Sequence, residues 1–428
     1  MDDKRRPGLM DSDGLQVRER SSDAAPASTR AVDGHGARVL LVSEGSGGHL
    51  IPAMEVASEL SRSGASVSLL FAQRRQTGEL FRDLLDRAAS QSIAAHAVNL
   101  SAWRAPSVFG APGSWAMGTA NRLRQTGLVW RMAERELSVS KPHVVVGFGG
   151  AFCLPVLATA KRRGVATMIH EQNVTFGQAN RWLARWVDRV ALSFPLASGV
   201  STPAAPRKPG IQPTIMTGLP VRDEIGRADR DAALARFGFK SSAPTVLIAG
   251  GSQGARAINR LVCDMVDQLF DGERSAWQFI HLTGAAECEE IRARYTAAGV
   301  TRAWIMPHTT DMAAAYAAAD IVVCRSGAST LAELARCAKP AVLIPYPHAN
   351  SHQRENARLV ESTGAGIRLD ESSTVAAQLA DVIRRLFSDV RLRTTMAERM
   401  RKLARPDATQ QLARAILELA GNNPGSLG

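Results

Sequence analysis

Short apolar runs recur along the chain from residue 38 onward, and many are apolar throughout rather than alternating with polar residues. Runs of this kind predict parallel strands that helices cover on both faces. One series of predicted strands occupies residues 38–43, 66–72, 144–148, 167–170, 190–194 and 214–217, and a second occupies residues 245–249, 278–282, 304–306, 321–324 and 341–345. Helical patterns separate the strands and fill residues 374–428.

Alternation of strands and helices predicts an α/β protein with doubly wound parallel sheets. A region rich in Pro and Gly, residues 203–220, separates the two series. We therefore expect two Rossmann-like domains, at 37–221 and 222–404, preceded by a polar, disordered tail at 1–36.

Composition places the protein among ordinary globular proteins, with 428 residues, 45% hydrophobic and 21% charged. The apolar runs are far shorter than the ~20 residues that span a bilayer. The tail lacks the apolar core of a secretory signal, and the five cysteines form no Cys-x-x-Cys pair. These features exclude a disulfide scaffold or zinc ribbon and predict a cytoplasmic protein.

The net charge is +12, and residues 101–190 contribute much of it, with twelve Lys or Arg against four acidic residues. Aromatic side chains stand among these arginines at Trp103, Phe109, Trp115 and Trp130. The segment is either a solvated basic surface or a site for an anionic membrane. Nucleic-acid binding is the weakest interpretation, because no nucleic-acid motif accompanies the charge.

Glycine-rich loops follow three predicted strands, at residues 45–52, 146–151 and 249–256. In doubly wound sheets the ligand lies beyond the carboxyl ends of the strands, where helix N-termini favour anions. Three such loops in two domains predict a ligand that carries phosphate. His49, at the end of the first loop, is either a general base or a helix cap.

Polar residues follow other strands. The loop of His170, Glu171, Gln172 and Asn173 is either exposed or faces a polar ligand. Glu333 stands where a carboxylate could bind the hydroxyls of a ribose, although a solvated helix glutamate is the alternative. No cluster has metal-ligand spacing, so we expect no metal or other cofactor.

The ordered motifs resemble the MurG family, the N-acetylglucosaminyltransferases of bacterial peptidoglycan synthesis. They are GSGGHLIPA at 45–53, GFGG at 147–150, HEQN at 170–173, NRWLA at 180–184, GLPVR at 218–222, GGSQGAR at 250–256, DMAAAY at 311–316, RSGAST at 325–330 and HQxxNA at 352–357. The resemblance covers about residues 38–420.

The resemblance implies a GT-B fold, in which the two Rossmann-like domains face each other across a cleft and the C-terminal helix, 405–428, returns to the first domain. It implies transfer of GlcNAc from UDP-GlcNAc to the 4-hydroxyl of MurNAc in undecaprenyl-diphosphate-MurNAc-pentapeptide (lipid I). The product is lipid II, formed with inversion. The first domain would bind acceptor and membrane, through the basic segment 101–135, and the second would bind UDP-GlcNAc. The protein would be peripheral, on the cytoplasmic face of the cell membrane.

Site residues follow from the same resemblance. His49 would be the catalytic base. The UDP-GlcNAc site would comprise Ser46, Gly47, Gly48, Asn173, Arg222, Ser252, Thr309, Ala328, Ser329, Thr330, Leu331, Ala332, Glu333, His352 and Gln353. Glu44 departs from the family pattern, because it replaces the usual first glycine of its loop.

Two alternatives remain. One is another GT-B enzyme with a lipid acceptor such as diacylglycerol, in which the HEQN segment would not be expected. The other is a non-catalytic protein that binds nucleotide or membrane, which the presence of His49, Arg222 and Glu333 together disfavours.

Overall fold

The computed structural model describes residues 34–45, 47–73, 78–99, 119–197, 199–200, 213–251, 254–347 and 352–421. The chain divides into two units, residues 1–32 and 33–428, and the second unit carries both sheets. The predicted tail at 1–36 therefore lies almost entirely outside the described residues.

The first sheet has seven parallel strands in the order β3-β2-β1-β4-β5-β6-β7. They are β1 (Arg38–Glu44), β2 (Ser66–Gln73), β3 (Ala94–Asn99), β4 (Val144–Gly147), β5 (Ala166–Glu171), β6 (Arg189–Leu192) and β7 (Thr214–Met216). The central strands β4, β5 and β6 are buried along their whole length, as their continuous apolar runs predict.

The second sheet has six parallel strands in the order β10-β9-β8-β11-β12-β13. They are β8 (Thr245–Ala249), β9 (Gln278–Leu282), β10 (Ala303–Met306), β11 (Ile321–Cys324), β12 (Ala341–Leu343) and β13 (Gly366–Arg368). Numbered within its own half, the second sheet follows the order 3-2-1-4-5-6 of dinucleotide-binding folds, and the first follows the same order with β7 added beside β6. The prediction of two doubly wound sheets is confirmed.

Helices of the first half are α1 (Gly47–Arg62), α2 (Gly78–Ser90), α3 (Thr119–Ser140), α4 (Cys153–Arg162) and α5 (Gln178–Leu183). Those of the second half are α6 (Arg230–Arg236), α7 (Arg256–Asp267), α8 (Asp271–Ala276), α9 (Cys288–Ala297), α10 (Met312–Ala318), α11 (Ala328–Cys337), α12 (His352–Ser362), α13 (Ala376–Ser388) and α14 (Val390–Lys402). The predicted domain boundary at 221/222 falls between β7 and α6.

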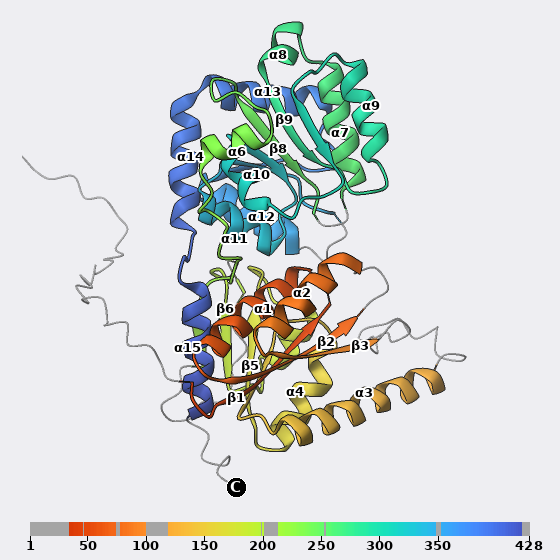
Figure 1. The fold of residues 1–428 in the computed structure, drawn as a ribbon, viewed down its shortest axis with the longest axis vertical. Helices are drawn as coiled ribbons and strands as arrows, with labels where there is room; N and C mark the ends of the chain where they lie inside the picture. The colour runs from red at the N-terminus through yellow and green to blue at the C-terminus, as the bar shows by residue number, and fades with distance from the viewer. Residues whose placement is uncertain are drawn as a thin grey trace, which may run out of the picture. The chain divides into compact units, whose positions relative to one another are not determined.

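The final helix, α15 (Ala408–Gly421), packs against α1, β4 and β5 of the first half (Figure 1). Arg189 of β6 holds it by donating to the carbonyl of Ala415 at 2.9 Å. The loops after β5 and β6 also insert Val174 and Phe194 into a hydrophobic core of the second half. The two halves are therefore joined by packing as well as by the chain.

Two strands escaped the sequence prediction, β3 and β13. Each is the outermost strand at one edge of its sheet. An edge strand has a neighbour on only one side, so it needs no continuous apolar run. β3 accordingly has mostly exposed or half-buried residues, and β13 is only three residues long.

Candidate active site

The first glycine-rich loop leads into α1, whose first turn contains His49. His49 is partly exposed, and its Nδ1 lies 2.6 Å from Oε1 of Gln172. The imidazole edge lies against Gly149 of the neighbouring loop, where a Cβ would come within 2.9 Å of His49 Cε1. Gly149 also has a φ of +106°, which favours glycine. The backbone at Gly149 therefore supports the imidazole ring from one side.

Glu44, the departure from the family pattern, is the last residue of β1. Its backbone N–H donates to the carbonyl of Gly149 at 3.3 Å. A Cβ on Gly150, whose φ is +89°, would overlap the Glu44 side chain. The two consecutive glycines thus make room for His49 and Glu44, and the glutamate is accommodated without leaving the strand.

The polar loop after β5 is held from inside the protein. His170, Glu171 and Gln172 are at most 4% exposed. The Glu171 carboxylate accepts hydrogen bonds from the backbone N–H groups of Asn173 (3.0 Å) and Gly177 (3.1 Å) and from the side-chain amides of Asn173 (3.3 Å) and Asn180 (2.9 Å). The prediction that these side chains are exposed or face a ligand is therefore wrong for the first three of the four residues.

His170 ties this loop to the turn where the chain leaves the first sheet. Burial lowers the pKa of His170 to about 4, so the ring is neutral near pH 7. Its Nε2 lies 3.0 Å from the carbonyl oxygen of Gly218, to which it donates, and 3.1 Å from the hydroxyl of Ser193. This contact anchors residue 218 beside the predicted domain boundary at 221/222.

Segments from both halves meet at the buried amide of Asn356, on α12. Its Nδ2 donates to Oδ1 of Asn173 at 3.1 Å and to the carbonyl of Ser326 at 3.0 Å. Its Oδ1 accepts from the backbone N–H of Val174 at 3.2 Å. One side chain thus fastens the loop after β5 to the loop after β11.

Two further contacts bring predicted residues of the two halves together. The hydroxyl of Ser329, at the start of α11, donates a long hydrogen bond of 3.5 Å to the carbonyl of Gly48. The hydroxyl of Thr175 lies 2.9 Å from Nδ1 of His352, whose pKa burial lowers. The start of α11 therefore lies beside α1, and the start of α12 lies beside the loop after β5.

Glu333 lies on α11 and accepts a hydrogen bond of 2.9 Å from the hydroxyl of Tyr316, a fully buried residue of α10. Burial raises the pKa of Glu333, and the positive charge of Arg222 opposes that shift. Arg222 also donates a long hydrogen bond of 3.5 Å to the carbonyl of Thr310. The structure thus gathers Arg222, Glu333 and the segment after β10.

Other predicted residues are held by local contacts. Gln353 accepts a hydrogen bond from the backbone N–H of Tyr346 at 2.9 Å, and the Thr309 hydroxyl accepts one from the N–H of Asp311 at 3.1 Å. Ala328, Thr330, Leu331 and Ala332 belong to α11, where the Leu331 side chain is buried in the core. Ser46 and Ser252 lie outside the described residues.

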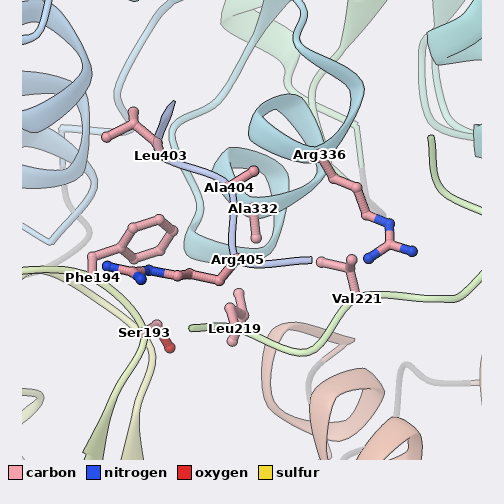
Figure 2. Close-up of a pocket in the computed structure, with 9 residues that line it drawn as sticks. All are labelled: Ser193, Phe194, Leu219, Val221, Ala332, Arg336, Leu403, Ala404 and Arg405. Atoms are coloured by element: carbon pink, nitrogen blue, oxygen red, sulfur yellow. The ribbon is translucent and has the colours of Figure 1, made fainter. Parts of the chain in front are cut away.

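A pocket lies where the chain twice crosses between the halves (Figure 2). It is lined by Ser193, Phe194, Leu219, Val221, Ala332, Arg336, Leu403, Ala404 and Arg405. Arg336 braces this region by donating to the carbonyls of Ile225 and Pro406. Of the predicted site residues only Ala332 is in the lining, so this is a hinge pocket distinct from the predicted UDP-GlcNAc site.

The basic segment predicted at the membrane, 101–135, is described only from residue 119, as part of α3. None of the helices within the described ranges has the length and apolarity needed to cross a membrane. The same ranges contain no group of three or more His, Cys, Asp or Glu side chains that could hold a metal ion.

Sequence comparison agrees with this geometry. The glycosyltransferase family 28 N-terminal domain matches residues 39–192, and the family's C-terminal domain matches residues 245–412. The chain belongs to glycosyltransferase family 28. The N-terminal model covers β1 to β6 of the first sheet, and the C-terminal model covers all six strands of the second.

Family 28 relatives match the chain along nearly their whole length. The protein named UDP-N-acetylglucosamine--N-acetylmuramyl-(pentapeptide) pyrophosphoryl-undecaprenol N-acetylglucosamine transferase is 35% identical in Chlorobium phaeobacteroides, over 89% of this chain and 99% of that one. The protein of the same name in Halorhodospira halophila is also 35% identical, over 89% and 98%. The resemblance to the MurG family is confirmed.

Solved structures agree with the GT-B fold. The crystal structure of Acinetobacter baumannii MurG is 28% identical, with a TM-score of 0.67, and the match covers 89% of this chain and 99% of that one. A UDP-GlcNAc 2-epimerase from Neisseria meningitidis, at 12% identity and a TM-score of 0.58 over 89% and 100%, shares the fold alone.

The sequence prediction assigned no role to Gln172, Tyr316 and Asn356. Each stands in one of the motifs that carry the family resemblance, at 170–173, 311–316 and 352–357. Each hydrogen-bonds to a predicted site residue: His49, Glu333 and Asn173 respectively. Their position in the motifs was the available signal, but their partners became visible only in the folded chain.

Proposed function

We propose that this protein transfers GlcNAc from UDP-GlcNAc to the 4-hydroxyl of MurNAc in undecaprenyl-diphosphate-MurNAc-pentapeptide, giving lipid II with inversion at the anomeric carbon. The observation that carries the proposal is the full-length match to relatives bearing that transferase name. Contacts between the halves support it, because a two-substrate reaction needs both halves at one place: the His49 helix start meets α11, and the loop after β5 meets α12.

The chemistry is a single displacement. The acceptor hydroxyl gives its proton to His49 while its oxygen forms a bond to the anomeric carbon. The bond from that carbon to the diphosphate oxygen breaks, and UDP leaves with the electron pair. Arg222 and the backbone N–H groups of the 250–256 loop stabilise the departing charge. Glu333 binds the ribose hydroxyls.

We further propose that the reaction needs no metal ion or other cofactor. Burial raises the pKa of Glu333, and Arg222 is close enough to this carboxyl group for its positive charge to oppose that rise. In this position it would compensate part of the negative charge of the departing UDP, as a metal ion would otherwise do.

The test is transfer of labelled GlcNAc from UDP-GlcNAc to a short-chain lipid I analogue, with and without EDTA. Product in both samples is the expected result. Product that disappears with EDTA and returns with Mg²⁺ contradicts metal independence alone. Binding of UDP-GlcNAc without transfer contradicts the proposed identity of the acceptor, and diacylglycerol is then the acceptor to test.

We also propose that the protein binds the cytoplasmic face of the membrane through the basic segment 101–135. The exposed face of α3 supports this. Leu128 and Val139 are 52% and 73% exposed. Because they are eleven residues apart, about three helical turns, they lie on the same side of the helix. Arg131 and Arg135 are exposed on that face as well. Apolar side chains among arginines suit an interface with anionic lipid.

Vesicle sedimentation tests this surface. We expect binding to phosphatidylglycerol vesicles that weakens when Leu128 and Val139 are both changed to Ser, and little binding to phosphatidylcholine. The control is Val390→Ser, which alters a valine of the second half that is 58% exposed. Equal binding by the double variant and the wild type would exclude α3 from the membrane contact.

A further inference from the structure

Gln172 lies between His49 and the second glycine-rich loop. Its side chain is only 4% exposed. Its Nε2 lies 3.1 Å from the carbonyl oxygen of Phe148, and its Oε1 lies 2.6 Å from Nδ1 of His49. A buried amide with one partner at each end has a fixed orientation, because turning it over would place two oxygens together.

This orientation determines which nitrogen of His49 carries a proton. The Phe148 carbonyl can only accept a hydrogen bond, so the amide nitrogen of Gln172 must face it. The amide oxygen therefore faces His49, and it too can only accept. The proton of the neutral imidazole must then be on Nδ1, which leaves the Nε2 lone pair free.

We propose that Gln172 is a positioning residue that holds His49 in its Nδ1–H tautomer and so makes Nε2 the atom that accepts the proton of the acceptor hydroxyl. This inference rests on the proposed function. When Nε2 takes the proton, the bond from Nδ1–H to Gln172 stays in place, so the charged ring needs no rearrangement. Gly149 lies beside the Cε1–Nδ1 edge of the same ring.

Other titratable groups surround His49. Glu44 lies against Gly150, next to the glycine on which the imidazole packs. His170, at the end of β5, and His352, on α12, both interact electrostatically with His49. Within the described residues, Gln172 is the group seen to hydrogen-bond Nδ1, so tautomer control is assigned to it.

The experiment compares Gln172→Leu and Gln172→Glu with the wild type in the lipid I transfer assay. Leu removes the acceptor for Nδ1–H, so we expect kcat to fall about 10- to 100-fold while KM for UDP-GlcNAc is unchanged. Glu keeps an acceptor and adds negative charge, so His49 holds its proton to higher pH. Its second oxygen replaces the amide nitrogen at the Phe148 carbonyl, so this variant should also lose stability. We expect the acid limb of the kcat–pH profile to move upward by about one pH unit, with much of the plateau activity retained.

The matched control is Gln278→Leu. Gln278 is a fully buried glutamine of the second half, whose amide donates to the carbonyls of Lys240 and Ala243 and to the hydroxyl of Thr245. Its loss should lower stability without moving the pH profile. If the pH profile moves equally in Gln278→Leu and Gln172→Glu, the role of Gln172 is structural and the inference is wrong.

Nitrogen-15 NMR of the histidine rings tests the tautomer in the wild-type protein, even if a variant does not fold. His49 signals are identified by their absence from the spectrum of His49→Asn. A protonated Nδ1 and an unprotonated Nε2 are expected, and the reverse would overturn the inference. If the wild type transfers no GlcNAc, the proposed function fails while this spectrum still reports the tautomer. Normal transfer and normal pH dependence in Gln172→Leu would overturn the inference alone.

Discussion

The two halves share one strand order but fill their glycine-rich loops differently. In the first half, Gly149 leaves space for a side chain, the imidazole of His49. In the second half, Gly250 and Gly254 leave space for backbone, because a Cβ on either would overlap the main chain at Ala255 or Thr283. The glycine-rich loop of the first half thus presents a titratable side chain, whereas that of the second half presents backbone peptide groups.

This difference indicates a division of tasks. A loop that holds an imidazole suits proton transfer, whereas tightly packed peptide groups at a helix start suit an anion. The polar residues of the first half are tied by Glu171 and Gln172, and the carboxylate of the second half by Tyr316. Changes in the first half should therefore affect kcat, and changes in the second half should affect donor binding.

His49→Ala is the most severe test of that division. Loss of a positioned general base should lower kcat by about 10²- to 10⁴-fold. Binding of UDP, measured by calorimetry, should change little, because most of the proposed UDP-GlcNAc contacts lie in the other half. Transfer at the wild-type rate would show that another group removes the proton, and a large loss of UDP affinity would break the division between the halves.

Glu333→Gln tests the second half. Removing the charge should weaken hydrogen bonds to the ribose by about 1.5–3 kcal/mol, which raises KM for UDP-GlcNAc about 10- to 100-fold. KM for the lipid I analogue should stay the same. The control is Glu361→Gln. Glu361 is an exposed residue near the end of α12 and forms an ion pair with Arg368 of β13. A fall in kcat with unchanged donor KM would contradict the assignment to ribose.

Asn356→Leu tests how firmly the halves are coupled. It leaves the N–H of Val174 and the carbonyl of Ser326 without their partner, at a cost of about 1–3 kcal/mol in the free energy of unfolding. Asn259→Leu is the matched control, since Asn259 is equally buried but bonds only within the second half.

Hydrogen exchange distinguishes these two variants. Asn356→Leu should let the strands of the two sheets exchange at different denaturant concentrations, whereas Asn259→Leu should weaken the second sheet more than the first. Loss of coupling in both variants, or in neither, would mean that Asn356 does not join the halves.

The sequence was informative where burial is complete. Strands β8, β9 and β11 were predicted at their observed limits, because a strand covered on both faces is mainly apolar. The polar exceptions in β9, Gln278 and His281, are buried and hydrogen-bonded. The same reasoning found two of the four edge strands, β7 and β10, but failed at β3, whose residues are mostly exposed or half-buried, and at the three-residue β13. The limit is physical, since an edge strand is defined by a neighbour that only the folded sheet supplies.

The candidate site shows a similar limit. Motifs located His49, Glu333 and Asn173, but their hydrogen-bond partners come from distant parts of the chain, as with Gln172 and His49, which are 123 residues apart. The spacing of residues along one segment carries no information on such pairs. The polar loop at 170–173 shows the consequence: polar residues there indicated exposure or a ligand, whereas other parts of the protein satisfy most of them.

The smallest effect we expect concerns pH, and it tests a feature that the halves share. Burial lowers the pKa of His170 in the first half to about 4 and that of His281 in the second to about 3. An unfolded histidine titrates near 6.5, so below that pH the unfolded chain binds more protons than the folded one. The free energy of unfolding should therefore fall as pH falls, by about 1 kcal/mol per histidine between pH 7 and 5.5.

Urea titrations at pH 7 and 5.5 measure this dependence. His281→Gln and His170→Gln should each lower the difference between the two pH values, whatever their effect on stability at pH 7, and the exposed His96→Gln controls for the loss of a histidine. His281 hydrogen-bonds to two side chains, Tyr295 and Asn259, whereas His170 bonds to the carbonyl of Gly218 and the hydroxyl of Ser193. If both variants reduce the pH dependence of the unfolding free energy equally, burial, which both histidines share, causes the acid sensitivity. If only one variant reduces it, the cause is the hydrogen-bond partners, in which the two histidines differ.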